Sequence, residues 1–172
     1  MTSRGEQCRR RCCAPWSCCV VHLRQRYHLR VAPSEIHGKG VFATTASKYD
    51  EEEVIFEAGD EICRYDGEPV TEEELDARYG DDTTTPYGLR IGDSENFEDG
   101  ALQRGTGSII NGTTRKKDAN CEYVPVDDDT AVRVVATRDI VDGEELLVYY
   151  GKKFRFDEPG VRFTTNHRKH YY

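Results

Sequence analysis

The stretch IVDGEELLVYYG, residues 140–151, says more about the fold than any other part of this 172-residue sequence. Its centre, ELLVYY, is a run of apolar and aromatic residues that predicts a short strand, and the Asp and Gly residues around it are typical of turns. The stretch is too short to specify a fold alone. Its interpretation depends on three segments that precede it.

The first segment is SEIHGKGVFA, residues 34–43. Within it, Gly38 and Gly40 flank Lys39 ahead of an apolar strand. The dinucleotide-binding fingerprint also requires a third glycine, a following helix and a trailing acidic residue, and the sequence has none of them in place. It also has no Gly-Lys-Ser/Thr for phosphate binding and no Gly-x-Ser-x-Gly for nucleophilic catalysis. Taken alone, the two glycines indicate a turn.

The second segment is EICRYDGEPVTEEELDARY, residues 61–79, which predicts a strand and then a helix. Thr71 followed three residues later by Glu74 is a capping box, and Gly80 is placed to end the helix. The strand precedes the helix with no crossover pattern around it. This is the one helix that the sequence predicts clearly.

The third segment is GSIINGTTRKKDANCEY, residues 107–123. Asn111-Gly112 after apolar residues predicts a type I′ turn, because both central positions of that turn require φ > 0. A hairpin turn leaves the second asparagine, Asn120, without an explanation.

The rest of the chain predicts short strands punctuated by Gly, Asp and Pro. They cover residues 27–31, 41–43, 54–56, 60–65, 86–91, 108–110 and 131–137. Helices and strands do not alternate, so a doubly wound sheet is excluded. We predict a mainly β domain with one or two short helices.

The formal charge of −8 is unevenly distributed. Residues 1–32 hold seven Arg against Glu6, and residues 152–172 hold six Lys and Arg against two acidic residues. Residues 33–151 therefore carry about −18. An acidic body repels the nucleic-acid backbone and attracts a basic partner. Contact with nucleic acid is expected only through the basic ends.

Five of the seven cysteines lie in CRRRCCAPWSCC, residues 8–19, while Cys63 and Cys121 stand alone. The odd total without a framework indicates a reducing compartment. No apolar run is long enough for a membrane span, and the leader does not match a secretory signal, so we expect a chain that is not secreted. We expect residues 1–26 to form a basic, cysteine-rich, disordered arm. Zinc or nucleic-acid binding by this arm is an alternative, although its cysteine spacing matches no zinc finger.

In their order and separations, the four segments resemble the SET-domain protein-lysine methyltransferases over residues 27–151. Gly-Glu-Glu-Leu followed by Tyr-Tyr-Gly is the most specific part of the resemblance. The resemblance implies a β-clip of small curved sheets. The segment that carries Asn111 is threaded by the segment that ends at Tyr150, as a C-terminal pseudoknot. It also implies S-adenosylmethionine as cofactor, with cofactor and substrate lysine at opposite ends of a narrow channel.

The resemblance further implies site residues. Tyr150 matches the catalytic tyrosine, and the lysine channel would be lined by Tyr65 and Tyr123. The residues expected to contact the cofactor are Gly38, Lys39, Gly40, Asn111, Gly112, Tyr150, Phe154 and Phe156. The glycines would allow close backbone approach, because they lack Cβ. No metal ligand is implied.

These residue types suit the chemistry of methyl transfer to lysine. The amine has a reference pKa of about 10.4, so it must lose a proton before it can attack a methyl group. A dry aromatic channel and a neighbouring sulfonium both disfavour the ammonium form. Tyrosine hydroxyls can orient the amine and contact the polarised methyl group.

The sequence also departs from the family pattern. In the family's Asn-His-Ser…Asn-Cys loop, Gly112 replaces the histidine and Thr113 the serine, and TRKKD lengthens the loop. Val148 stands where many members carry a Phe or Tyr that tunes the number of methyl groups added. Residues 152–172 form a basic, aromatic segment in place of the family's cysteine-rich one, and contain no Cys.

The leading hypothesis is a lysine methyltransferase that acts on a basic protein segment such as a histone tail, in the nucleus or on chromatin, with the cytoplasm as the alternative location. A second hypothesis, motivated by Gly112, is a catalytically silent SET module that binds a basic peptide. The third places the function in the cysteine-rich arm.

Overall fold

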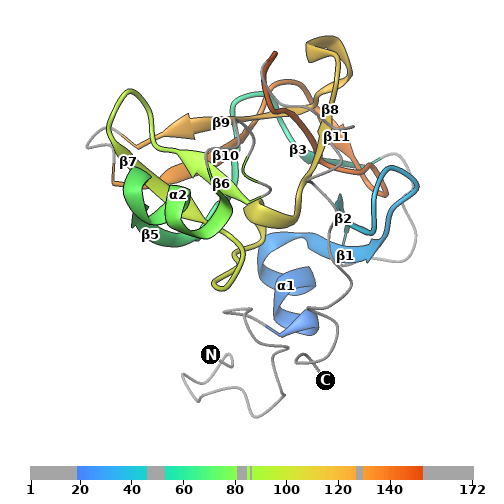
Figure 1. Cartoon of the computed structure of the whole chain (residues 1–172). Helices are drawn as coiled ribbons and strands as arrows, with labels where there is room; N and C mark the ends of the chain where they lie inside the picture. Colours follow the sequence, from blue (N-terminus) through green and yellow to red (C-terminus); the bar gives the residue numbers. More distant parts are fainter. Residues whose placement is uncertain (1–18, 46–52, 81–84, 86, 127–129, 153–172) are drawn as a thin grey trace.

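The computed structural model describes residues 19–45, 53–80, 85, 87–126 and 130–152. These residues form two α-helices, two 3-10 turns and twelve short strands, coloured along the chain in Figure 1. In chain order they are α1 (Val20–Tyr27), β1 (Leu29–Pro33), β2 (Lys39–Ala43), β3 (Val54–Phe56), β4 (Glu61–Arg64), β5 (Glu68–Thr71), α2 (Glu72–Tyr79), β6 (Gly88–Arg90), β7 (Asn96–Asp99), η1 (Gly107–Ile109), β8 (Asn111–Thr113), η2 (Lys116–Asp118), β9 (Cys121–Pro125), β10 (Val132–Ala136), β11 (Ile140–Val141) and β12 (Leu147–Tyr149).

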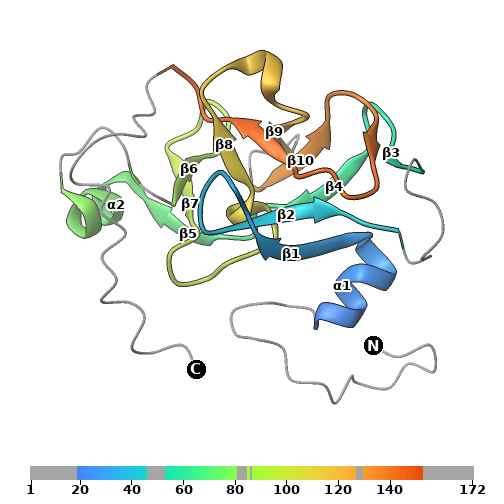
Figure 2. The ribbon, with the colours of Figure 1, turned by 90° about the vertical axis from the view of Figure 1, so that its right-hand side faces the viewer.

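The strands make four small sheets rather than one large one. Their orders are β1-β2, β4-β10-β9-β12-β8, β11-β3 and β5-β7-β6. α1 packs against β1, and α2 lies against β5 and β7 (Figures 1 and 2). The prediction of a mainly β domain with small sheets and short helices is confirmed.

Strand β12 lies between β8 and β9 and pairs with both, although these two strands are themselves connected by a single loop. It pairs in parallel with β8, where Val148 lies opposite Gly112, and also in parallel with β9, where Val148 lies opposite Cys121. β8 and β9 are consecutive strands joined through η2. The end of the described chain therefore passes between the two ends of an earlier loop, which is the threaded arrangement that the resemblance implied.

Apolar side chains from three of the four sheets, all except β5-β7-β6, form the main core. Along β10 the side chains at 132, 134 and 136 are buried, as expected for a strand with one face toward the core. The fully buried core residues include Leu29, Val41, Ile110, Val134, Ile140, Leu146 and Val148. Val148 is thus a core residue in this chain.

Helix α2 begins and ends as the sequence predicts. The Thr71 hydroxyl accepts from Glu74 N–H, the Glu74 carboxylate accepts from Thr71 N–H at 2.9 Å, and Gly80 caps the other end with φ +77°. Leu75 is its buried residue. The capping box is confirmed.

Three local predictions are wrong. Residues 20–26, expected in the disordered arm, belong to helix α1, which buries Leu23 in the core and replaces the start of the strand predicted at 27–31. Asn111-Gly112 is not a hairpin turn but the start of β8, because parallel pairing with β12 outweighs the local turn preference. Residues 107–109 form a 3-10 turn instead of a strand. Residues 1–18 of the arm lie outside the described residues.

Within the described residues, no helix has the length and apolar character needed to cross a membrane.

Candidate active site

The turn between β1 and β2 lies against the start of β8. Ser34 N–H donates to the Gly38 carbonyl at 3.1 Å and closes the turn. The side-chain amide of Asn111 donates to the carbonyls of His37, at 3.1 Å, and Lys39, at 3.3 Å. The structure therefore brings Gly38 and Lys39 together with Asn111, as the resemblance implied.

Glu145 is a second anchor for this turn, and the sequence did not single it out among the many carboxylates of the acidic body. Its Oε1 accepts from Asn111 Nδ2 at 2.8 Å, and its Oε2 accepts from the Ser34 hydroxyl at 3.0 Å. A Cβ at Gly40 would lie 2.7 Å from Cδ of Glu145, so a side chain at position 40 would displace the Glu145 carboxylate. Gly40 therefore allows the carboxylate to lie against the backbone of β2.

Asn120 holds the threaded segment from the other side of the loop. Its Nδ2 donates to the Glu145 carbonyl at 2.8 Å, and its Oδ1 accepts from Leu147 N–H at 2.7 Å. Asn120 is only 2% exposed, so these hydrogen bonds are shielded from solvent. The two asparagines flanking the loop thus both bind the segment that contains Glu145. Asn120, which a hairpin turn left unexplained, therefore anchors the threaded segment.

Gly112 is buried beneath the ring of Tyr150. A Cβ at position 112 would lie 2.9 Å from Cζ of Tyr150 and closer still to Cδ2 and Cε2. The phenol hydroxyl donates to the Ile110 carbonyl at 2.6 Å. Tyr150 thus contacts the segment 110–112 both through its ring, over Gly112, and through its hydroxyl, at Ile110.

Three tyrosines meet at this point. The rings of Tyr123 and Tyr150 are nearly parallel, with centroids 6.5 Å apart, and Tyr65 meets Tyr123 edge-on at 5.6 Å. Each hydroxyl donates to a backbone carbonyl: Tyr65 to Tyr87 at 2.6 Å, Tyr123 to Gly107 at 3.1 Å, and Tyr150 to Ile110 at 2.6 Å. The three residues expected at the lysine channel are therefore neighbours.

Burial keeps these phenols neutral. It is the main cause that raises the pKa of Tyr65, Tyr123 and Tyr150 above the usual range, and the neighbouring Tyr150 raises that of the other two further. Because a carbonyl cannot donate, each phenol proton is committed to its backbone acceptor. Each hydroxyl can then offer only lone pairs to a ligand.

The tyrosines line a cavity of about 250 Å³. Its walls are Tyr65, Thr85, Tyr87, Gly88, Leu89, Ser108, Tyr123, Tyr149, Tyr150 and Gly151. Tyr87 and Tyr149 were not predicted as site residues. Tyr87 belongs to a predicted strand, and Tyr149 precedes Tyr150 in another; neither carries a local signal that marks it as a site residue.

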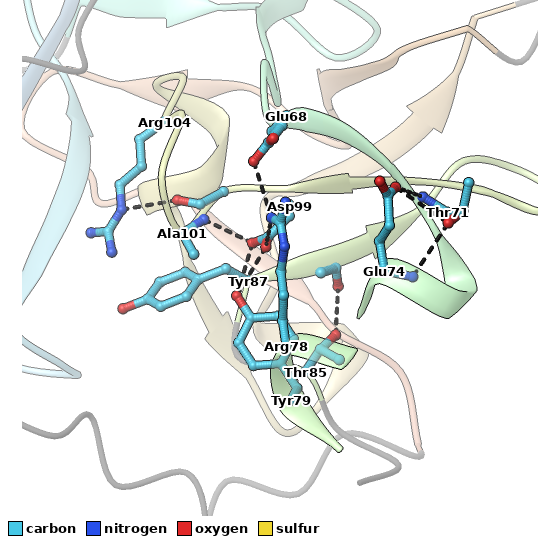
Figure 3. A network of polar contacts seen from close by, with 12 residues as sticks. Glu68, Thr71, Glu74, Arg78, Tyr79, Thr85, Tyr87, Asp99, Ala101 and Arg104 are labelled. Carbon is cyan, nitrogen blue, oxygen red and sulfur yellow. Dashed lines mark hydrogen bonds and ion pairs between the residues drawn. The ribbon is translucent and has the colours of Figure 1, made fainter. Parts of the chain in front are cut away.

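A buried carboxylate supports the wall that carries Tyr87 (Figure 3). Asp99 is fully buried, and it accepts from Arg78 at 2.8 Å, from the Tyr79 hydroxyl at 3.0 Å and from Ala101 N–H at 2.8 Å. The next residue, Gly100, donates its N–H at 2.9 Å to the Tyr87 carbonyl that also accepts from Tyr65. The network thereby connects α2 to the cavity.

Arg104 packs against the same tyrosine. Its guanidinium lies 4.4 Å from the ring centroid of Tyr87, and its Nε donates to the Gly100 carbonyl at 2.9 Å. The Tyr87 ring and its carbonyl are therefore both held by the segment that follows Asp99.

The described site residues form one continuous group, which runs from the Gly38 turn through Asn111 and Gly112 to the three tyrosines. Phe154 and Phe156, expected over the adenine, lie outside the described residues. Within the described part of the chain, no three His, Cys, Asp or Glu side chains are grouped to hold a metal ion.

Comparison with known proteins agrees with this geometry. The SET domain family matches residues 38–151. No curated protein matches the sequence. Among solved structures, the Chaetomium thermophilum polycomb repressive complex 2 (PRC2) is 25% identical with a TM-score of 0.58, over 74% of this chain and 16% of that chain.

A second solved structure, ctPRC2 in complex with H3K27me3 and H3K27M, is 25% identical with a TM-score of 0.57. The match covers 72% of this chain and 14% of that one. This chain thus spans only a small part of the solved chains that it matches. The family match covers most of the residues that the structure describes, so the chain belongs to the SET domain family.

Proposed function

We propose that this chain is an S-adenosylmethionine-dependent protein-lysine N-methyltransferase that acts on a basic protein segment such as a histone tail. The observation that carries the proposal is the group of three tyrosines that line one cavity, each with a hydroxyl that donates its proton to a backbone carbonyl. Membership of the SET domain family supports the same reaction, since the family consists largely of protein-lysine methyltransferases.

The committed hydroxyl protons suit a lysine nucleophile. An amine presents N–H donors and one lone pair, and hydroxyls that offer only lone pairs accept its N–H bonds. None of the three can donate to the amine's lone pair, which stays free to attack. The aromatic walls disfavour the charged ammonium, so the proton is lost to solvent before transfer.

The turn at Gly38 suits the methionine part of the cofactor. A Cβ at Gly38 would meet no atom within 4 Å, so this side of the turn is open to a ligand. A bound S-adenosylmethionine supplies a methyl group on a positively charged sulfur. Tyr65, Tyr123 and Tyr150 line the same cavity, and hydroxyl lone pairs directed into it would favour a cationic methyl group there. The in-line alignment of amine and methyl group then provides much of the acceleration.

The charge of the chain supports a basic protein substrate. Residues 33–151 carry about −18, and a strongly acidic surface steers positively charged segments toward it. The PRC2 structures that this chain resembles include one in complex with H3K27me3 and H3K27M. We therefore propose histone H3 as the first substrate to test, and association with chromatin in the nucleus.

A methyl-transfer assay tests the proposal. The full chain is incubated with radiolabelled S-adenosylmethionine and a panel of core histones. We expect label on one histone, and a loss of at least about 100-fold in Tyr150→Phe, which keeps the ring but removes the hydroxyl. Tyr27→Phe is the matched control, because Tyr27 is half exposed on α1, and it should keep full activity.

The second candidate, a silent module that binds a basic peptide, is favoured by Gly112 in place of the motif histidine. It predicts binding of an unmodified histone peptide without cofactor binding. Calorimetry separates the two candidates. Cofactor binding in the micromolar range contradicts the silent module, and peptide binding with no cofactor binding contradicts the enzyme.

A further inference from the structure

We propose that Gly112 is the positioning residue for Tyr150, so that the glycine is a requirement of this active site and not the mark of a lost one. The inference rests on the proposed function in treating Tyr150 as catalytic. Its structural part, the dependence of the Tyr150 ring position on residue 112, stands without it.

The backbone at position 112 does not require glycine. Six described glycines have positive φ, and Gly112 is not among them. It lies in β8 opposite Val148 of β12, in extended conformation, where any residue is allowed. The reason for glycine at position 112 must therefore be steric: there is no room for a side chain.

The space is filled by Tyr150. Tyr150 follows β12 directly, and its ring lies over Gly112, where the Cβ of any other residue would stand 2.9 Å or less from three ring atoms. Real Cβ atoms do not approach aromatic carbons so closely. Because the ring lies flat against the backbone of β8, its hydroxyl reaches the Ile110 carbonyl at 2.6 Å.

The other side of the ring leads to the cavity. Tyr123 stands parallel to Tyr150 at 6.5 Å, and both line the cavity wall. A side chain at position 112 would push the ring away from β8 and toward this free space. The ring would then narrow the cavity, and the hydroxyl would leave the Ile110 carbonyl.

A displaced hydroxyl would change the chemistry. Its proton, no longer bound by Ile110, is free to donate to the lone pair of the substrate amine and to block attack. The turnover number should therefore fall more than the apparent substrate affinity, which Tyr65 and Tyr123 continue to support. Gly112→His, which restores the family's motif residue, should lose more activity than Gly112→Ala.

A double-mutant cycle in the full chain tests the contact. Gly112→Ala should lower the urea midpoint by roughly 1 M when Tyr150 is present, and should have no such effect in the Tyr150→Ala background, where the ring is absent. In the Tyr150→Phe background the loss should persist, since that ring still occupies the space. Gly67→Ala is the matched control: its Cβ would meet Glu98 and Asp99, so its cost should be equal in all backgrounds.

A spectroscopic reading separates positioning from stability. In a chain with isotope-labelled tyrosine, the ring signal of Tyr150, assigned from Tyr150→Phe, should shift in Gly112→Ala as it leaves the stack with Tyr123. In the methyl-transfer assay, kcat should fall at least about tenfold while KM changes less than about threefold. If the unsubstituted chain transfers no methyl group, the proposed function fails, and the cycle and the ring signal still decide the present inference.

Each outcome decides the matter. An equal cost of Gly112→Ala with and without the Tyr150 ring, or an unmoved Tyr150 signal, overturns the inference. If Gly112→Ala does not fold but the double substitution with Tyr150→Ala does, the inference is supported. If neither folds, position 112 rejects side chains for a reason other than Tyr150, and the inference is wrong.

Discussion

Asn120 binds Leu147 through both its side chain and its backbone: its Oδ1 accepts from Leu147 N–H at 2.7 Å, and its own N–H donates to the Leu147 carbonyl at 3.0 Å. Leu147 is the first residue of β12, so this pair fixes where the threaded strand enters between β8 and β9. Substitution of Asn120 can remove the hydrogen bond made by its side chain, while the backbone hydrogen bond remains.

Asn120→Ala should lower the free energy of unfolding by about 2–6 kcal/mol. The substitution leaves Leu147 N–H and the Glu145 carbonyl without partners in a buried place, and each unsatisfied group costs about 1–3 kcal/mol. Urea unfolding followed by circular dichroism measures the change. Asn96→Ala is the control, because Asn96 is exposed at the start of β7, and it should change stability by less than about 0.5 kcal/mol. Similar losses for both would contradict the role given to Asn120.

Glu145→Gln should weaken cofactor binding more than it weakens the fold. The amide has one acceptor oxygen where the carboxylate has two, so either the Ser34 hydroxyl or the Asn111 amide loses its partner. The turn that carries Gly38 should then open more often. We expect a rise in the cofactor Kd of about tenfold, by calorimetry, with faster hydrogen exchange at Ser34 N–H. Glu144→Gln, at the neighbouring residue that pairs with Arg138, is the comparison and should leave the Kd unchanged.

Glu98 should make stability depend on pH around neutrality. Desolvation is the main cause that raises the pKa of Glu98 from 4.5 to about 7, with a smaller contribution from Asp66, and its Oε2 has no hydrogen-bond partner among the described residues. The folded protein therefore binds this proton more tightly than the unfolded one. The favourable effect is fully present below pH 4.5 and is lost as the pH rises through 7.

The variant that tests this is Glu98→Gln, which cannot ionise. Its stability should fall less than that of the unsubstituted chain between pH 5 and pH 8, and at pH 8 it should be more stable, by an amount on the order of 2–3 kcal/mol. Glu95→Gln, at an exposed position nearby, should not alter the pH dependence. Parallel pH curves for Glu98→Gln and the unsubstituted chain would rule the prediction out.

Tyr79→Phe should cost about 1–2 kcal/mol of unfolding free energy. It removes one donor from the fully buried Asp99 carboxylate, which keeps Arg78 and Ala101 N–H as partners. Thermal or urea unfolding gives the value, and Tyr27→Phe on α1 is the control with no expected change. A loss above about 4 kcal/mol would mean that Arg78 and Ala101 do not hold Asp99 without the tyrosine.

The resemblance of four short segments to a family grouped Gly38, Asn111 and the three tyrosines, and the structure places these residues next to one another. Their roles in binding and catalysis stay predictions. The elements that build the site were predicted less completely. Helix α1 was missed because its residues follow a run of Arg and Cys typical of an arm, and only Leu23 is buried in the main core. β8 was mistaken for a turn because its partner, β12, lies more than thirty residues later in the chain. Glu145 was missed because nothing local distinguishes it from the carboxylates beside it.

The threaded position of β12 has a consequence for how the protein reaches its native state. β12 cannot pair with β8 and β9 until the loop between them has closed, and these contacts join distant parts of the chain, which slows folding. Tyr150 follows β12, so it reaches Gly112 only when this late step is complete. A chain that has collapsed without this threading therefore lacks the contact between Tyr150 and Gly112, even where its other tyrosines are in place.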